Sequence, residues 1–415
     1  MKLTKRIISL VLLVCVLLPC VLSLASCEEK VRKFYIYNWG EYMPLGKYGS
    51  SNIPEEFEKH YNATHDDKIA VVYSIYSSNE DMYAKLKSGS NKIDLIIPSD
   101  YMIARLISEG MLAKLDYSNI PNYKYISDQF KNTEGQSDGP SYDPDCEYTV
   151  PYTYGLVGLI YNTTMVDEAP TSWRILWDER YTGMILNFNN SRDAFGIAQY
   201  ILSYETGHTS EDDNYVNTSD KARWDESLEL LQAQRPVMQA YVMDEVFNKM
   251  ESGAAALAPY YAGDFYIMQE VNEDLAFVFP EEGTNIFVDA MCVPATSENK
   301  DIAEAFMNFV LTPEWAKEIA EYIAYACPNT AVTEDESYEY YQDEILYPNT
   351  ENMTTYYFEN LDIETLRYSN SLWEKMKVES SSGNGIYVFA AVIVATVALF
   401  FIISAIKKRK LRKYY

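Results

Sequence analysis

Hydrophobic and polar residues follow two different periods along residues 31–109. Three segments are rich in β-branched and aromatic residues or form a short apolar run, and they predict strands at residues 31–37, 68–76 and 93–97. Three further segments have helical spacing and predict helices at residues 53–61, 79–87 with Asn79 as the cap, and 101–109. Strand and helix therefore alternate. This favours an α/β domain with a mainly parallel sheet, whose ligands bind beyond the carboxyl ends of the strands.

The pattern is less regular after residues 132–146, a polar segment rich in Gly, Pro and Asp that indicates a loop. Residues 148–161 have the pattern of extended chain, and we expect them to cross to a second lobe. Further strands are predicted at residues 184–188, 254–259, 276–279 and 286–293. Further helices are predicted at residues 172–181, 192–204, 219–233, 302–311 and 313–325, and near the end of the acidic, Tyr-rich segment 330–379.

The first 27 residues have the pattern of a secretory signal: a basic start, an apolar run over residues 7–18, and small residues that lead to a cysteine. The string Leu24-Ala25-Ser26-Cys27 fits a bacterial lipobox, in which the cysteine takes a diacylglyceryl group and becomes the new N-terminus. We therefore expect a lipoprotein anchored through Cys27. The alternatives are an ordinary signal peptide with an incidental cysteine, and an uncleaved anchor.

The C-terminal region predicts a second membrane attachment. Residues 385–406 contain no charged residue, and about 20 apolar residues suffice to span a bilayer. A polar linker, residues 380–384, precedes this expected transmembrane helix, and a basic tail, residues 407–415, follows it. By the positive-inside rule the tail stays cytoplasmic, so residues 28–384 are expected outside the cytoplasm at the cell membrane. The alternative is a buried core helix.

Composition and charge narrow the classes of function. Of the 415 residues 48% are hydrophobic, which excludes a purely disordered acidic chain. The formal net charge is −27, from 61 Asp and Glu against 34 Lys and Arg. Nine of those 34 bases lie in the terminal segments, so about −36 remains between them. A surface this acidic repels phosphate backbones, which argues against nucleic acid as the main partner and favours cations or basic ligands.

The sequence lacks the short motifs of the common catalytic and metal sites. It contains no Gly-x-Ser-x-Gly, no His-Glu-x-x-His, no P-loop and no Cys-x-x-Cys. Beyond the signal, its cysteines are Cys146, Cys292 and Cys327, which allow at most one disulfide. We therefore expect a binding protein that is not an enzyme and that holds no cofactor and no resident metal.

Seven short segments, read in order, resemble the spermidine/putrescine-binding proteins of bacterial ABC importers. The segments are residues 35–42, 77–86, 94–101, 151–158, 172–177 and 288–294, and Tyr325 with Pro328-Asn329. Together they span roughly residues 33–375. The resemblance implies an α/β, two-lobed clamshell of the periplasmic-binding-protein type (type II), with a ligand cleft between the lobes. The first lobe is expected at residues 33–152 with 288–326, and the second at residues 153–287 with 327–379.

The resemblance also implies a polyamine ligand, a permease partner and a set of site residues. The implied ligand contacts are Trp39, Glu41, Tyr42, Ser99, Asp100, Tyr101, Tyr261, Phe287, Asp289 and Tyr325. Asp289 is the implied central carboxylate. The chain departs from the family pattern where two acids three residues apart are expected, because it has Asn190 and Asp193 there. It also has Tyr261 and Phe287 in place of two Trp, and Glu359 is a weakly aligned replacement acid.

The chemistry of a polyamine suits such a site. Ammonium groups on methylene spacers are bound by carboxylates, and aromatic faces cover the methylenes and attract the cations. Two alternatives remain open at this point. One is another ligand on the same scaffold, such as ferric iron bound through Tyr260 and Tyr261, a sugar or a peptide. The other is a surface sensor or adhesin that keeps the fold but not transport.

Overall fold

The computed structural model describes residues 31–131, 140–210 and 213–381, with side chains described as far as residue 377. In the first part of the chain, three strands pair in parallel in the order β2-β1-β3. These are β1 (Arg32–Trp39), β2 (Ile69–Tyr76) and β3 (Leu95–Ile96). The helices that connect and flank them are α2 (Ile53–Thr64), α3 (Asn79–Ser88) and α4 (Asp100–Ser108). The predicted alternation of strand and helix is confirmed in this part.

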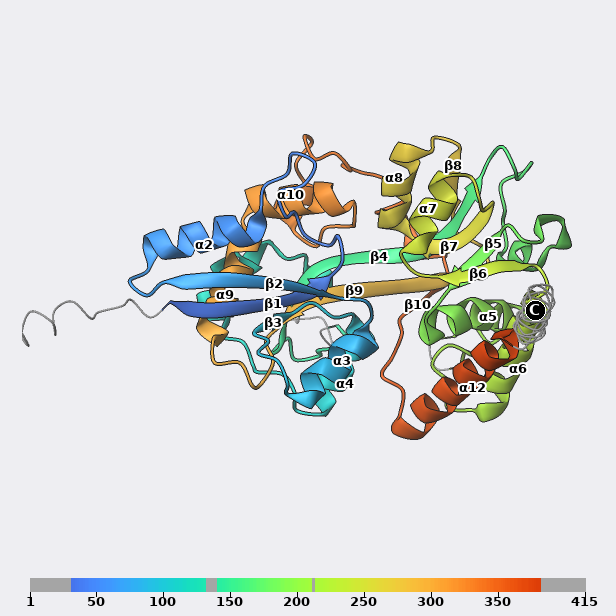
Figure 1. The fold of residues 1–415 in the computed structure, drawn as a ribbon, viewed down its shortest axis with the longest axis horizontal. Coiled ribbons are helices and arrows are strands. Elements are labelled where there is room, and N and C mark those ends of the chain that lie inside the picture. Colours follow the sequence, from blue (N-terminus) through green and yellow to red (C-terminus); the bar gives the residue numbers. More distant parts are fainter. Residues whose placement is uncertain (1–30, 132–139, 211–212, 382–415) are drawn as a thin grey trace, which may run out of the picture.

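Two long strands, β4 (Thr149–Asn162) and β9 (Thr284–Cys292), run side by side through the middle of the molecule (Figure 1). They pair antiparallel with each other, and β9 is also antiparallel to β3. The described sheet has the order β2-β1-β3-β9-β4-β7-β5-β6. Its remaining strands are β5 (Ile185–Phe188), β6 (Met238–Val242), β7 (Leu257–Tyr261), β8 (Leu275–Val278) on β4, and β10 (Thr355–Tyr356) on β9. The sheet is therefore mixed, with antiparallel pairs at its centre and parallel pairs toward both ends.

Helices cover both faces of each half of the sheet (Figure 1). In the second half, α5 and α6 lie with α12 on one side, and α7 and α8 lie on the other. The remaining α-helices are α5 (Ser191–Thr206), α6 (Lys221–Gln234), α7 (Glu245–Glu251), α8 (Ala262–Val271), α9 (Lys300–Val310), α10 (Pro313–Ile323), α11 (Thr330–Thr333) and α12 (Ile363–Ser381). Short 3-10 turns occur at Tyr117–Asn119, Pro121–Tyr125, Asp128–Phe130, Trp173–Trp177, Glu179–Tyr181 and Thr350–Asn352.

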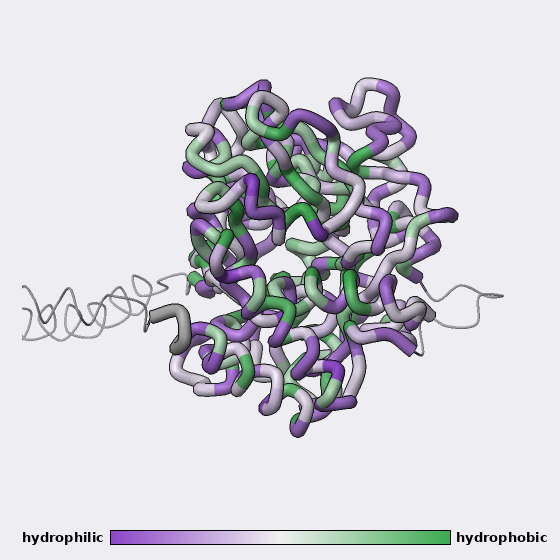
Figure 2. Tube along the Cα trace, turned by 90° about the vertical axis from the view of Figure 1, so that its right-hand side faces the viewer, coloured by the Kyte–Doolittle hydropathy of each residue, from purple (hydrophilic) through white to green (hydrophobic). Residues whose placement is uncertain are grey.

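Two large hydrophobic cores divide the molecule into two lobes. The first contains the ring cluster Phe34, Phe57 and Phe306, and the second contains Trp173 and Trp224. The members of each core are buried, and the hydrophobic stretches, green in Figure 2, lie mostly in the interior of the molecule. β4 contributes to both cores, and β9 pairs with it antiparallel from Ile286 to Cys292, so these two strands join the lobes.

The segment after Tyr325 returns along both lobes. Cys327, Val332 and Tyr338 pack against Ala316 and Ala320 of α10, next to the first core. Farther along, residues 356–376 contribute to the second core. The chain therefore passes from the first lobe to the second between Tyr338 and Tyr356. The lobe boundaries derived from the sequence remain a prediction.

Local details differ from the sequence predictions where polar side chains end a helix. The predicted helix at residues 172–181 is instead two 3-10 turns, because Asp178 accepts a bond from the backbone N–H of Arg180 and begins a new turn there. Ser78, not Asn79, caps α3: its hydroxyl accepts from the N–H of Asp81. The sequence patterns did not indicate β6, α7 or α8.

The expected architecture needs one larger correction, which concerns the transmembrane helix. Across residues 31–131, 140–210 and 213–381, no helix is both long enough and apolar enough to cross a membrane. The longest C-terminal helix there, α12, carries charged residues such as Glu364, Arg367 and Lys375 along its length. The predicted span, residues 385–406, lies outside the described residues, as do the signal segment and Cys27. The fold of the described residues is therefore the two-lobed α/β module.

Candidate functional site

Asp289 lies at the centre of the candidate site, on β9 between the two cores. Its side chain is only 4% exposed. The Tyr42 hydroxyl donates to its Oδ2 at 2.7 Å, and Thr153 Oγ1 lies 2.5 Å from the same hydroxyl. Oδ1 is buried and has no hydrogen-bond partner among the described residues. Burial raises the pKa of Asp289 to about 6, and the neighbouring hydroxyls of Ser99 and Tyr42 limit the rise.

A row of aromatic rings leads from this carboxylate toward the second lobe. Tyr42 meets Tyr325 edge to face with ring centroids 5.3 Å apart, and Tyr325 meets Phe287 at 6.2 Å. Phe287 in turn meets Tyr261 of β7 at 5.4 Å. The Tyr325 ring lies directly against Gly263, where a Cβ would be 2.2 Å from its Cδ2. Glycine at 263 is thus what allows this ring to occupy its place in the row.

Asp264 is a site residue that the sequence reasoning missed. It lies in the first turn of α8, and the Tyr325 hydroxyl donates to its Oδ2 at 3.1 Å. Burial raises the pKa of Asp264 to about 7, and the charge of Asp244 adds to the rise. No Lys or Arg of the described chain forms an ion pair with it. Because α8 was not predicted, nothing in the sequence marked this acid apart from the many others.

The wall formed by the second lobe contains Asn190 and Asp193. Asn190 caps α5: its Oδ1 accepts from the N–H of Asp193 at 2.9 Å, and its Nδ2 donates to Asp193 Oδ2 at 2.6 Å. Tyr261 donates its hydroxyl to the same Oδ2 at 2.9 Å. Burial raises the pKa of Asp193, and these two donors limit the rise. The structure therefore brings together three of the expected residues, with Asn190 fixing the Asp193 carboxylate.

The wall formed by the first lobe is organised by Asn79, which the sequence reasoning treated only as a helix cap. Its Nδ2 donates to Ser99 Oγ and to the Tyr101 hydroxyl, both at 3.1 Å. Tyr101 donates in turn to Glu80 Oε1 at 3.0 Å. Ser99 also forms a backbone bridge with Asp289, so this polar chain lies beside the residue that carries the central carboxylate.

Asp100 faces away from that chain, toward the backbone. Its Oδ1 accepts from the N–H of Tyr101 at 2.7 Å, and its Oδ2 accepts from the N–H of Val288 at 3.3 Å. It is 3% exposed, and burial raises its pKa to about 8. The bond to Val288 joins the start of α4 to β9. Asp100 therefore has a structural role in addition to the ligand contact expected of it.

Trp39 is the last residue of β1, and Glu41 follows it by two residues. The Trp39 indole packs on Tyr76 with centroids 4.6 Å apart and donates to the carbonyl of Ile97 at 2.8 Å. Glu41 is exposed and forms an ion pair with Lys47 at 2.6 Å. Trp39 therefore has a fixed orientation, whereas the charge of Glu41 is already balanced at the surface.

Comparisons with known proteins agree with this arrangement of lobes. A family model for the bacterial extracellular solute-binding proteins matches residues 90–348. The chain belongs to this family. A spermidine/putrescine-binding periplasmic protein of Salmonella typhimurium is 32% identical over 322 residues, which cover 77% of this chain and 84% of the relative. The putrescine-binding periplasmic protein SpuD of Pseudomonas aeruginosa is 28% identical, over 85% of this chain and 93% of its own length.

A solved structure supports the fold of this solute-binding protein. The structure described as a putative spermidine/putrescine ABC transporter from Listeria monocytogenes has a TM-score of 0.73 and 32% identity, and the match covers 83% of this chain and 99% of that one. The two-lobed periplasmic-binding-protein fold implied by the resemblance is thus confirmed. The chain's family and relatives are proteins of solute binding and transport.

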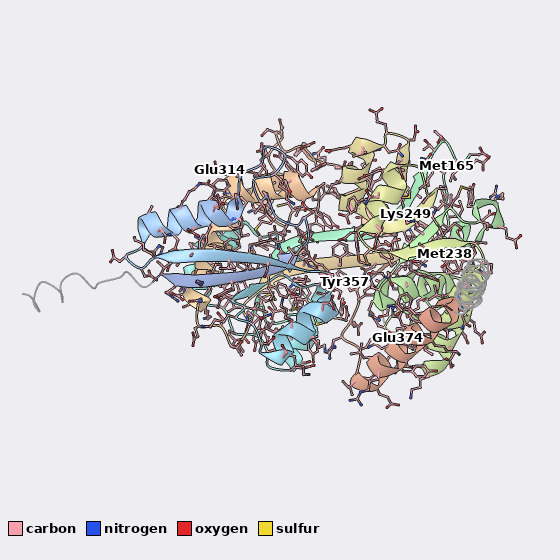
Figure 3. The ribbon with its side chains drawn as sticks, viewed as in Figure 1. Met165, Met238, Lys249, Glu314, Tyr357 and Glu374 are labelled. Carbon is pink, nitrogen blue, oxygen red and sulfur yellow. The ribbon has the colours of Figure 1, made fainter. Side chains whose placement is uncertain are left out.

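Glu359 bonds none of the candidate site residues described above. It is exposed, and its Oε1 accepts from Asn217 Nδ2 at 3.3 Å. Its neighbours Tyr357 and Phe358 are the residues after β10 that reach the boundary between the lobes: Tyr357 lies there in Figure 3, and Phe358 meets Tyr101 at 6.4 Å. Burial and then the charge of Asp100 raise the pKa of Tyr357.

The iron alternative requires two phenolates and further ligands in one place. Tyr260 is 3% exposed and stacks on Phe188 at 5.4 Å, while the Tyr261 hydroxyl is committed to Asp193. In the part of the chain that the structure describes, no group of three or more His, Cys, Asp and Glu is arranged to hold a metal ion. The geometry therefore favours an organic cation over iron.

Proposed function

We propose that this solute-binding protein captures a polyamine, such as putrescine or spermidine, and delivers it to an ABC permease. The observation that carries the proposal is the Asp289 carboxylate. Its Oδ1 is buried without a partner, and its Oδ2 is held by Tyr42. An unpaired buried charge is costly, so a cation that binds here removes a penalty already present in the empty protein.

The surroundings of Asp289 match the rest of a polyamine. The row from Tyr42 through Tyr325 and Phe287 to Tyr261 offers aromatic faces to a methylene chain. Each ammonium over such a face gains on the order of 0.5 to 2 kcal/mol. Asp264 and Asp193 supply further carboxylates, and neither forms an ion pair with a Lys or Arg of the described chain. Charge-assisted hydrogen bonds to these groups would fix the amines.

The relatives support the ligand class and the location. The names of the Salmonella and Pseudomonas proteins specify spermidine or putrescine and the periplasm. A structure from Streptococcus pneumoniae with 33% identity and a TM-score of 0.67 is named as the substrate-binding protein of a spermidine/putrescine ABC transporter. We therefore place the lobes outside the cytoplasm, with lipid at Cys27 as the proposed attachment.

The lobes would bind by closing on the ligand. β4 contributes to both cores and β9 pairs with it, so these strands connect the lobes and are where bending would occur. The candidate site residues come from both lobes. Closure excludes water from the carboxylates, which strengthens their ion pairs with the amine. A transport protein of this kind changes no covalent bond, so the ligand leaves as it entered.

Calorimetry and thermal unfolding with the full-length protein test the proposal. We expect putrescine or spermidine to bind with measurable heat and to raise the melting temperature, and mass spectrometry to recover the ligand unchanged. The variant D289N should weaken binding by more than tenfold. E273Q is the matched control, because Glu273 is an exposed acid in the turn before β8. No heat and no thermal shift with any diamine or polyamine would refute the function.

A further inference from the structure

Two carboxylates from opposite lobes stand at the far end of the site from Asp289. Glu80 is the second residue of α3 in the first lobe, and Asp193 lies in the first turn of α5 in the second. Each accepts a tyrosine hydroxyl: Tyr101 donates to Glu80 at 3.0 Å, and Tyr261 donates to Asp193 at 2.9 Å. Both tyrosines pack against both hydrophobic cores, so both carboxylates are held at the boundary between the lobes.

A chain of polar side chains runs from this end of the site to Ser99, whose backbone is bridged to that of Asp289. Asp289 is bridged to Ser99, Asn79 bonds both Ser99 and Tyr101, and Tyr101 bonds Glu80. The Oδ1 of Asp289, which has no partner among the described residues, is an acceptor for an ammonium at one end of this chain. Glu80 and Asp193 mark the other end.

Neither Glu80 nor Asp193 forms an ion pair with a Lys or Arg of the described chain. Arg192, beside Asp193 in sequence, directs its guanidinium to the carbonyl of Val216 at 3.1 Å and to Asn217 Oδ1 at 3.0 Å. Burial raises the pKa of Asp193; its hydrogen bonds and the charge of Arg192 limit the rise, and the charge of Glu80 across the boundary adds to it. The two carboxylates therefore repel when both are ionised and nothing lies between them.

We propose that Glu80 and Asp193 form a second carboxylate pair, contributed by opposite lobes, which holds the distal ammonium of a bound polyamine and makes lobe closure depend on that charge. This inference rests on the proposed polyamine function. In the second lobe the uncharged Asn190 stands where the family pattern has an acid. Glu80 would supply the corresponding negative charge from the first lobe. A ligand with one ammonium satisfies Asp289 but leaves the distal pair repelling, so it closes the lobes poorly.

Putrescine and N-acetylputrescine separate the two ends of the site. The acetylated compound keeps the whole four-carbon chain, but one of its amines is a neutral amide, so it carries one positive charge fewer. In the full-length protein we expect putrescine to bind at least tenfold more tightly than N-acetylputrescine. The variant E80Q should weaken putrescine binding at least tenfold and reduce that preference at least fivefold. Y101F, which removes the hydroxyl that positions Glu80, should have an intermediate effect on putrescine.

D81N is the matched control for E80Q. Asp81 lies in the same first turn of α3 and carries the same charge, but it bonds the Ser77 hydroxyl rather than Tyr101. It should leave both ligands within twofold of the unchanged protein. If E80Q also leaves putrescine within twofold, the distal pair is refuted while the polyamine function stands. If the unchanged protein binds no amine at all, the proposed function itself fails.

A fall in affinity that is equal in E80Q and D81N would show a general field effect and would also overturn the assignment. Should N-acetylputrescine bind below detection, the putrescine comparison between E80Q and D81N decides alone. Equal melting temperatures of E80Q and the unchanged protein, each without ligand, confirm that the exposed Glu80 can be replaced without loss of the fold.

Discussion

The Tyr42 hydroxyl and the Asp289 carboxylate are 247 residues apart in sequence and 2.7 Å apart in space. Tyr42 follows the first strand of the first lobe, and Asp289 lies on the strand that joins the lobes. Oδ2 therefore accepts this bond, whereas Oδ1 has no hydrogen-bond partner among the described residues. It also stabilises the ionised carboxylate that a cation requires, against the desolvation that raises its pKa.

Replacing Tyr42 with phenylalanine therefore tests whether this bond prepares the site. Y42F removes the donor to Asp289, and a hydrogen bond to a charged group contributes about 1.5 to 3 kcal/mol. We expect polyamine affinity measured by calorimetry to fall about tenfold. Y368F is the matched control, because the Tyr368 hydroxyl donates to Asp225 at the same 2.7 Å on the exposed surface. Equal affinities for Y42F and Y368F would contradict the prediction.

The pH dependence of binding follows from two raised pKa values. The pKa of Asp289 is about 6 and that of Asp264 is about 7, in both cases chiefly because of burial. A cation binds the ionised forms, so binding releases protons below these values and affinity falls as the pH is lowered from about 7.5 to 5. At pH 5 a carboxyl with a pKa of 6 is about 90% protonated, which costs about tenfold in affinity.

Titration calorimetry in buffers with different ionisation enthalpies measures this proton release. We expect the number of released protons to rise as the pH falls from 7.5 to 5 and to be smaller in the variant D264N. E273Q serves as the control, since Glu273 is exposed and remote from the site residues. An affinity that stays constant from pH 7.5 to 5 would show that neither carboxylate pairs with the ligand.

Local sequence patterns predicted those elements whose apolar positions are regular. The strands β1 and β2 and the helices α2 and α4 appear close to their expected bounds. Elements were missed where the packing partner, rather than the local period, determines the structure. α8 is one example: it starts directly after β7 and packs its Phe265 and Met268 into the second core.

The candidate site was accessible from sequence only through a resemblance. Asp289 stood out as an acid within an apolar run, and the structure gives it the buried position that this pattern suggested. Asp264 and Glu80 are two acids among 61, and only the fold brings them to tyrosine hydroxyls at the lobe boundary. Glu359 was expected from a weak alignment, and its backbone places it at Asn217 instead.

Gly263 gives a prediction that separates binding from stability. A Cβ at this position would lie 2.2 Å from the Tyr325 ring, whereas a Cβ at Gly158 would lie 2.1 Å from the Phe277 ring inside the second lobe. Overpacking of this kind costs about 1 to 3 kcal/mol. We expect both G263A and G158A to lower the melting temperature, but only G263A to weaken polyamine binding, because only it displaces Tyr325. Equal affinities for the two variants would remove Tyr325 from the site.

Asn190 offers a test of ligand selectivity. In N190D an aspartate caps α5 as well as asparagine does, so the helix should be retained. The change removes the donor to Asp193 Oδ2 and places a new carboxylate beside it. The added negative charge favours a ligand with one more ammonium, and we expect the preference for spermidine over putrescine to rise about five- to tenfold.

N349D is the control for this change, because Asn349 also caps a helical turn, at Thr350–Asn352, and lies outside the group of site residues. Competition between spermidine and putrescine, followed by calorimetry, measures the ratio in all three proteins. The ligand-free N190D protein should also melt at a lower temperature above about pH 7, since two neighbouring carboxylates repel once both are ionised. A spermidine-to-putrescine ratio that is the same in N190D and N349D would mean that the third ammonium does not reach the wall formed by α5.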